Sequence, residues 1–89
     1  MTNEFTNGQL YWDSQDGNNE GWWLSYRDAR GNEEGYAIDG DRDASTESLA
    51  AAVASKLTDS SLEVKVFRGD EPKGRISIVD GAVENWRAA

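Results

Sequence analysis

The fold is decided around residues 46–57, which read TESLAAAVASKL. Leu49, Val53 and the final leucine recur at the spacing of one helical face, and alanines stand beside them. Ser45 or Thr46 can cap the first turn, because either hydroxyl can accept a hydrogen bond from a free backbone N–H group. The stretch predicts a single helix with a narrow apolar stripe that packs against a sheet.

Segments of alternating polarity predict strands before this helix. In residues 22–27, Trp22, Leu24 and Tyr26 point to one face of a strand while Trp23 points to the other. The two tryptophans cannot enter the same core, so Trp23 is expected on the open face of the sheet. The other elements expected on this side of the helix are strands over residues 9–13 and 34–38 and turns over residues 14–19 and 28–32.

A strand is also expected directly after the helix. Leu62, Val64 and Val66 alternate with other residues and point to one face. If that face is the buried one, Phe67 lies on the open face together with Trp23. The sequence therefore predicts two aromatic side chains on the exposed side of the sheet.

The rest of the chain completes the expected fold. Residues 75–79 predict a strand, Asp80-Gly81 is a type I′ turn signal, and residues 82–86 fit either a last strand or a short helical turn. Polar residues 1–8 lack periodicity and are expected to be a flexible lead-in to a single domain over residues 9–89. The predicted fold class is α+β with two layers, one helix packed on a mainly antiparallel sheet, in the order β-β-β-α-β-β.

The residue types that are missing exclude most catalytic chemistry. The chain of 89 residues has no His and no Cys, which removes imidazole bases, thiolate nucleophiles, disulfides and the usual zinc ligands. Carboxylate pairs such as Glu33-Glu34 lie in polar stretches, where water keeps both groups ionised. We therefore expect no catalytic residues, no cofactor and no enzymatic activity.

One acidic segment begins with the spacing of a calcium loop. Asp39, Asp41 and Asp43 stand at positions 1, 3 and 5 of an EF-hand-like loop. The match then ends, because Ala44 replaces the glycine of position 6 and Ala50 replaces the bidentate glutamate of position 12. The segment is interpreted as a solvated acidic loop rather than as a metal site.

The excess negative charge is confined to the first half of the chain. The net charge is −8, and residues 1–47 hold eleven acidic and three basic residues, whereas residues 48–89 hold six of each. A negative protein repels nucleic-acid phosphates and anionic lipids, so direct binding to nucleic acid or to a membrane is not expected. The same charge attracts a basic protein surface.

The sequence favours a non-enzymatic protein-binding module that presents its acidic half to a basic partner. The expected contact residues are carboxylates that steer the encounter and aromatic side chains that anchor it: Glu33, Glu34, Asp39, Asp41, Asp43, Trp23 and Tyr36. One form of this hypothesis is a phage-type inhibitor whose carboxylates imitate phosphates in the basic groove of a nucleic-acid-handling protein.

Two alternative functions remain open. The exposed aromatic face can serve as a binding surface for carbohydrates or other flat small ligands. Alternatively, the acidic residues only improve solvation, in a bacterial domain without a discrete site. Because the chain lacks Cys and has no apolar run near the roughly 20 residues of a membrane span, a cytoplasmic monomer or homodimer is expected.

Overall fold

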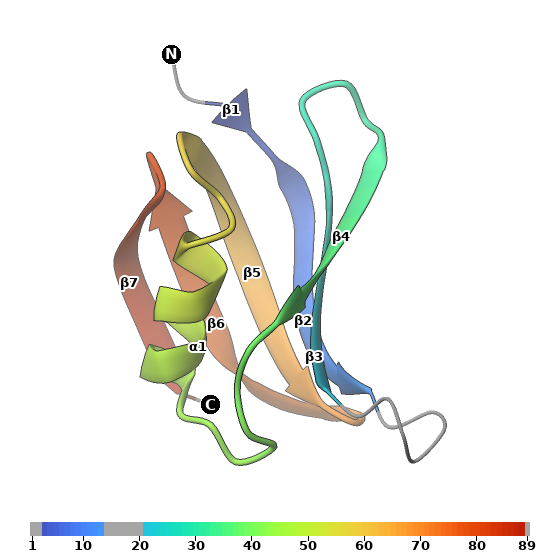
Figure 1. The fold of residues 1–89 in the computed structure, drawn as a ribbon, viewed down its shortest axis with the longest axis vertical. Helices are drawn as coiled ribbons and strands as arrows, with labels where there is room; N and C mark the ends of the chain where they lie inside the picture. Colours follow the sequence, from blue (N-terminus) through green and yellow to red (C-terminus); the bar gives the residue numbers. More distant parts are fainter. Residues whose placement is uncertain (1–2, 14–20, 89) are drawn as a thin grey trace.

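The computed structural model describes residues 3–13 and 21–88, which form seven strands and one helix (Figure 1). In chain order the elements are β1 (Asn3–Glu4), β2 (Thr6–Asp13), β3 (Gly21–Arg27), β4 (Glu33–Ile38), α1 (Thr46–Ala54), β5 (Ser60–Arg68), β6 (Glu71–Val79) and β7 (Ala82–Ala88). The turn predicted over residues 14–19 lies outside the described residues, as do the first two residues of the predicted lead-in.

The strands form one mixed sheet. Their order is β4-β3-β2-β5-β6-β7, and β1 pairs with the start of β5. Each half of the sheet is antiparallel, and the halves join through the parallel pair β2–β5. A parallel pair requires a long crossover, which here contains β3, β4 and α1. As a result, β2, β4 and β5 run in the same direction, and the segments that follow them lie at one end of the sheet.

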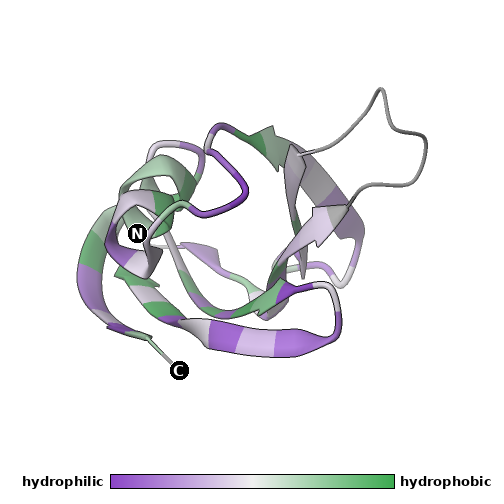
Figure 2. Ribbon diagram, turned by 90° about the horizontal axis from the view of Figure 1, so that it is seen from below, coloured by the Kyte–Doolittle hydropathy of each residue, from purple (hydrophilic) through white to green (hydrophobic). Residues whose placement is uncertain are grey.

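The predicted two-layer α+β class is wrong, because the protein is mostly β and its sheet is mixed. Figure 2 shows the strands curving round a common interior, with the helix on the side that the sheet leaves open. The helix contacts β6 and β7 at one edge of the sheet and β4 at the other. With nine residues it is only about 13 Å long. It therefore closes the space between two sheet edges instead of forming a second layer.

The helix begins as predicted and ends early. Ser45 is the N-cap, and its hydroxyl accepts a hydrogen bond of 3.1 Å from the Ser48 backbone N–H. The last helical residue is Ala54, whereas the sequence pattern continues to Leu57. The Leu57 N–H donates to the Ala54 carbonyl, three residues back, so the chain tightens out of the α-helix in this last turn.

The core contains apolar side chains from the inner face of the sheet and from one side of the helix. The predicted inward-facing residues of strands and helix are all buried, namely Trp22, Leu24, Tyr26, Leu49, Val53, Leu57, Leu62, Val64 and Val66. Their removal from water is the main force that holds so small a chain together. Alternation along β3 and β5 therefore predicted correctly which of their side chains are buried.

The C-terminal hairpin settles the open choice between strand and helical turn. Residues 82–86 belong to β7, which pairs antiparallel with β6. Asp80 and Gly81 have φ angles of 52° and 78°, and two positive φ angles are what a type I′ turn requires. The turn predicted from Asp80-Gly81 is present.

The N-terminal residues differ from the sequence prediction. Residues 3–8, expected to be an irregular lead-in, contribute β1 and the start of β2. Gly8 lies so close to β5 that a Cβ atom there would collide with the Glu63 carbonyl oxygen. Backbone pairing with β5 and the packing of Phe5 against the core hold these residues, while most of their other side chains are exposed. The polar composition of residues 3–8 therefore gave no indication that they form strands.

Candidate functional site

Alternation along the strands gives the sheet an inner and an outer face. Trp22 is 1% exposed on the inner side, whereas Trp23 is 40% exposed on the outer side. On β5 the buried Val66 is followed by Phe67, which is partly exposed on the outer side. The prediction that Trp23 and Phe67 share the open face is confirmed.

Strand register brings three aromatic side chains into one line across the outer face. Trp23 of β3 stands opposite Tyr11 of β2, and Tyr11 stands beside Phe67 of β5. Pro72 of β6 lies opposite Phe67 and continues the line. Because neighbouring strands are about 4.8 Å apart, the line is about 14 Å long. We call Trp23, Tyr11 and Phe67 the aromatic row.

A glycine on the edge strand makes room for the first ring of this row. A Cβ atom at Gly35 of β4 would lie 2.6 Å from Cζ2 of the Trp23 indole. The indole therefore covers the Gly35 position, and any larger residue there would displace it. The position of the Trp23 ring is set by the neighbouring strand even though much of its surface is exposed.

The next register position on the outer face carries three positive charges. Lys65 of β5 stands opposite Arg75 of β6, which stands opposite Arg87 of β7. All three side chains are exposed. Within residues 3–13 and 21–88, neither of the two ion pairs includes any of them. We call Lys65, Arg75 and Arg87 the cation row.

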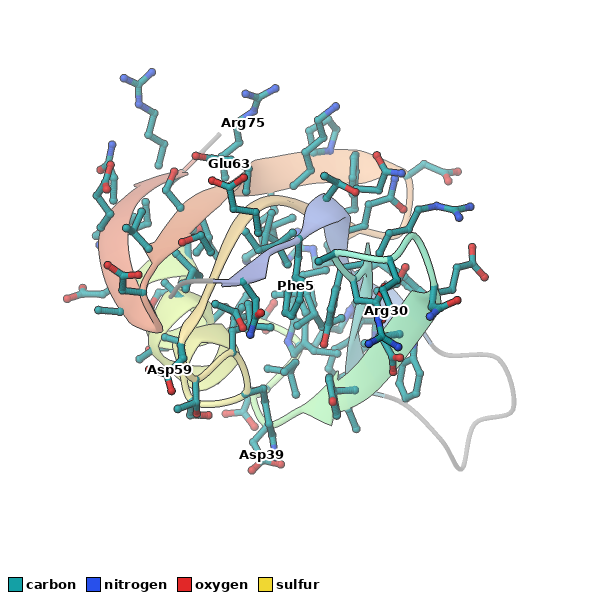
Figure 3. The ribbon with its side chains drawn as sticks, turned by 90° about the horizontal axis from the view of Figure 1, so that it is seen from above. Phe5, Arg30, Asp39, Asp59, Glu63 and Arg75 are labelled. Atoms are coloured by element: carbon teal, nitrogen blue, oxygen red, sulfur yellow. The ribbon has the colours of Figure 1, made fainter. Side chains whose placement is uncertain are left out.

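A surface hollow of about 410 Å³ lies beside the cation row, at the Phe67 end of the aromatic row. Its lining includes Phe67, Pro72 and all three members of the cation row. Two smaller hollows, of about 280 and 220 Å³, adjoin it, and Arg75 lines all three. Figure 3 shows Arg75 directed away from the core, beside Glu63. An apolar wall next to a few polar groups is typical of small-molecule sites.

The predicted contact residues of β3 and β4 are divided between the two faces. Trp23 and Glu33 lie on the outer face, whereas Glu34 and Tyr36 stand opposite residues that point inward. Tyr36 is 41% exposed and stacks on Tyr26, with ring centroids 6.2 Å apart. Trp23 and Tyr36 therefore do not anchor the same flat surface of a partner.

The predicted acidic contacts form two separate groups. Glu33 and Glu34 begin β4, whereas Asp39, Asp41 and Asp43 follow its end. The strand between them holds the groups about 17 Å apart. The structure does not bring these five carboxylates into one patch.

Contacts with neighbouring elements hold the acidic loop that follows β4. The Trp22 indole N–H donates a hydrogen bond of 2.7 Å to the Asp41 carbonyl oxygen. The Asp43 carboxylate pairs with the Arg68 guanidinium at 3.0 Å, so part of the loop's charge is compensated. The turn after β5 lies at the same end of the sheet and adds Asp70 to the negative charge there.

Three stacked rings line the inner face near the start of β4. Phe5 lies 4.7 Å from Tyr26 between ring centroids, and Tyr26 stacks in turn on Tyr36. Burial raises the pKa of Tyr26 well above its ordinary value, and the nearby Tyr36 and Glu34 raise this pKa further. Tyr26 therefore keeps its proton at neutral pH and contributes packing rather than charge.

Sequence reasoning found part of the outer face and missed the rest. It identified Trp23 and Phe67 as open-face residues but not Tyr11 or the cation row. Alternation along β5 does predict that Lys65 shares a face with Phe67. Alternation carries no information about which strands lie beside β5. The aromatic row needs β2 as one neighbour of β5, and the cation row needs β6 as the other.

No metal site or membrane helix is found in the part of the chain that the structure describes. Its acidic residues form no group of three or more that could hold a metal ion, and its helix is too short and polar to span a bilayer. The aromatic row, the cation row and the hollow beside them make the outer face of the sheet the candidate site. Comparisons with protein-family models, curated proteins and solved structures give no match for this chain.

Proposed function

We propose that the protein is a non-enzymatic binding module that holds a flat-faced small ligand, such as a sugar or a planar heterocycle, on the outer face of its sheet. The observation that carries the proposal is the alignment of Trp23, Tyr11 and Phe67 on three neighbouring strands. Aromatic rings stack on flat apolar surfaces, and a line of rings can contact successive units of one ligand. The lack of His and Cys supports a binding role without catalysis.

The rigidity of the aromatic row supports the same proposal. All three rings project from paired strands, and the Trp23 indole packs over Gly35. Groups held in place before binding lose little conformational entropy when the ligand arrives, which favours affinity. A site on strands is also more accurately shaped than one on loops.

The proposal can be tested by titrating the protein with neutral oligosaccharides and with adenosine while tryptophan fluorescence is recorded. We expect a saturable change for at least one probe. Because an aromatic contact contributes about 0.5–1.5 kcal/mol, Trp23→Ala and Phe67→Ala should each weaken binding of that probe by about 2- to 10-fold.

Tyr36→Ala is the matched control for Trp23→Ala. Tyr36 is 41% exposed, against 40% for Trp23, but it lies on the inward-facing side of β4. Its replacement should leave ligand affinity unchanged. Equal losses in all three variants, with native circular dichroism spectra, would contradict an outer-face site, as would the absence of a saturable signal for every probe.

A second candidate is the protein-binding module with an acidic surface that meets a basic partner. Its support is the shared direction of β2, β4 and β5, which gathers the Asp39–Asp43 loop and the turn with Asp70 at one end of the molecule. The distance between the Asp39–Asp43 loop and Glu33 with Glu34 weakens this candidate, because the expected acidic contacts form two groups at opposite ends of β4.

Charge reversal separates the two candidates. Replacement of Asp39, Asp41 and Asp43 by Lys should abolish capture of a basic partner but leave oligosaccharide or adenosine binding intact. All three side chains are exposed, so the variant should keep its fold, as measured by circular dichroism. If partner capture from a host lysate survives the reversal, the acidic-surface candidate is wrong.

A further inference from the structure

The cation row is an unfavourable arrangement unless an anion occupies it. Lys65, Arg75 and Arg87 stand side by side on adjacent strands, and like charges directly opposite each other destabilise a sheet. The chain has 17 acidic residues against 9 basic ones, yet no carboxylate in the described residues pairs with this row. Glu63 lines the two adjoining hollows with members of the row but forms no ion pair with them, so the row keeps positive charge that a ligand can neutralise.

The hollow beside the cation row has the chemistry of an anion site. The three cations line it together with apolar residues that include Phe67 and Pro72, and no acidic side chain is part of its lining. Phe67 of the aromatic row and Lys65 of the cation row are two residues apart on β5, which is about 7 Å along the strand. A ligand that contacts both needs a flat ring and an anionic group close together.

We propose that this hollow binds a small phosphorylated ring compound of the nucleoside-phosphate class. The phosphate lies on Lys65, Arg75 and Arg87, and the planar ring packs against Phe67 and Pro72. The inference rests on the proposed function, since it assigns a ligand class to the same outer face.

The number and type of the cations favour phosphate over carboxylate. A carboxylate carries one charge and is satisfied by a single arginine fork, whereas a phosphate group carries about −1.5 to −2 at neutral pH and has three acceptor oxygens. Two guanidinium groups and one ammonium provide enough donors to surround such a group. Three adjacent cations therefore match a multiply charged anion.

The charges around the hollow favour a compact ligand over a nucleic-acid strand. Glu63 lines both smaller hollows that adjoin it, and two further carboxylates precede Pro72, Asp70 in the turn after β5 and Glu71 at the start of β6. A long polyanion would pass these carboxylates and meet the net charge of −8. A nucleotide confined to the hollow of about 410 Å³ does not reach these carboxylates and brings fewer phosphates toward the net negative charge. Figure 3 shows the acidic-loop residue Asp39 on the opposite side of the molecule from Arg75.

The test compares three probes by isothermal titration calorimetry: ADP, adenosine and inorganic pyrophosphate. Hydrogen bonds to charged groups contribute about 1.5–3 kcal/mol, so ADP should bind at least about 10-fold more tightly than adenosine. Arg75→Gln should remove this advantage and leave adenosine binding unchanged. Pyrophosphate should bind more weakly than ADP, because it lacks the ring.

Arg27→Gln is the matched control. Arg27 is also an outer-face arginine, but it pairs with Glu33 at 3.5 Å and does not line the hollow. The inference predicts wild-type ADP affinity for this variant. An equal loss in Arg27→Gln and Arg75→Gln would show that general charge attraction, not the hollow, binds ADP, and the inference would be wrong.

Further outcomes separate the inference from the proposed function. If adenosine or a neutral oligosaccharide binds through Trp23 and Phe67 but ADP has no advantage over adenosine, the proposed function stands and the phosphate site is rejected. Tighter binding of an oligothymidylate or an oligogalacturonate than of ADP would likewise overturn the assignment, in favour of single-stranded nucleic acid or of an acidic glycan. Absence of ADP binding at millimolar concentration rejects the phosphate site outright.

Discussion

Single residues decide how closely the strands of this sheet approach one another. At Gly8 the backbone of β2 lies against β5, and a Cβ atom would meet the Glu63 carbonyl oxygen and, at 2.9 Å, the Leu62 side chain. At Gly21, the first residue of β3, nothing lies within 4 Å of the same added atom. The two glycines therefore have opposite roles, since only the first is required by close contact.

Alanine substitutions at these two glycines should have opposite effects. Gly8→Ala forces backbone atoms apart at the β2–β5 junction and should lower the free energy of unfolding by about 1–3 kcal/mol. Gly21→Ala should leave stability unchanged or raise it by up to about 1 kcal/mol, because alanine restricts the unfolded chain more than glycine. Urea denaturation measures both, and equal effects would show that the junction tolerates a side chain.

Tyr26 should make stability depend on alkaline pH. Its ordinary pKa is 10.0, and burial raises this pKa in the folded state. The folded chain thus keeps the proton after the unfolded chain has lost it, so stability is full below pH 10.0 and falls as the pH rises above it. Tyr26→Phe should flatten this fall, measured as the free energy of unfolding against pH. An unchanged slope in Tyr26→Phe would assign the fall to other groups.

At the scale of elements, α1 closes the sheet. It contacts strands at both edges of the sheet, β4 and β7, and its buried side, with Leu49 and Val53, faces the common interior. Its exposed side carries Glu47 and Ala51. A short helix at this place removes apolar surface from water that the curled sheet alone leaves uncovered.

Charge placed on the buried side of α1 should unfold the protein. Val53 is fully buried, so Val53→Asp introduces an unpaired carboxylate into the core and should cost about 3–5 kcal/mol, much of the stability of a small domain. Ala51→Asp, on the exposed side, should cost less than about 1 kcal/mol. Thermal melts followed by circular dichroism separate the two, and a native-like melt of Val53→Asp would refute the observed helix orientation.

At the scale of the whole molecule, charge is distributed by face and by end. The net charge is −8, yet the outer face of β5, β6 and β7 presents three adjacent cations, while the acidic loop after β4 occupies one end. Repulsion among the three adjacent cations lowers the stability of the fold. This cost is explained if the cation row serves binding rather than folding.

Removal of the central cation should therefore stabilise the unliganded protein. Arg75→Gln relieves repulsion with Lys65 and Arg87 and should raise the free energy of unfolding by about 0.2–1 kcal/mol at low ionic strength. The gain should shrink as salt is added, because screening weakens the repulsion in the wild type. Arg27→Gln, which loses an exposed ion pair, should give no gain. Destabilisation by Arg75→Gln would mean that the row serves the fold.

The sequence predicted individual elements better than their assembly. The N-cap at Ser45, the turn at Asp80-Gly81 and the burial of Trp22 beside exposed Trp23 all follow from interactions within a few residues. The five predicted acidic contacts stand in two groups because they flank the two ends of β4, and an extended strand keeps its ends apart.

The sequence alone determined which side chains of β3 and β5 are buried and which are exposed, because a strand alternates with a period of two residues whatever lies beside it. Only the tertiary structure decided that β2 pairs in parallel with β5, and that α1 closes the curled sheet rather than covering it. These choices depend on burial shared by segments far apart in the chain, which no local pattern records. The aromatic row and the cation row exist only through them.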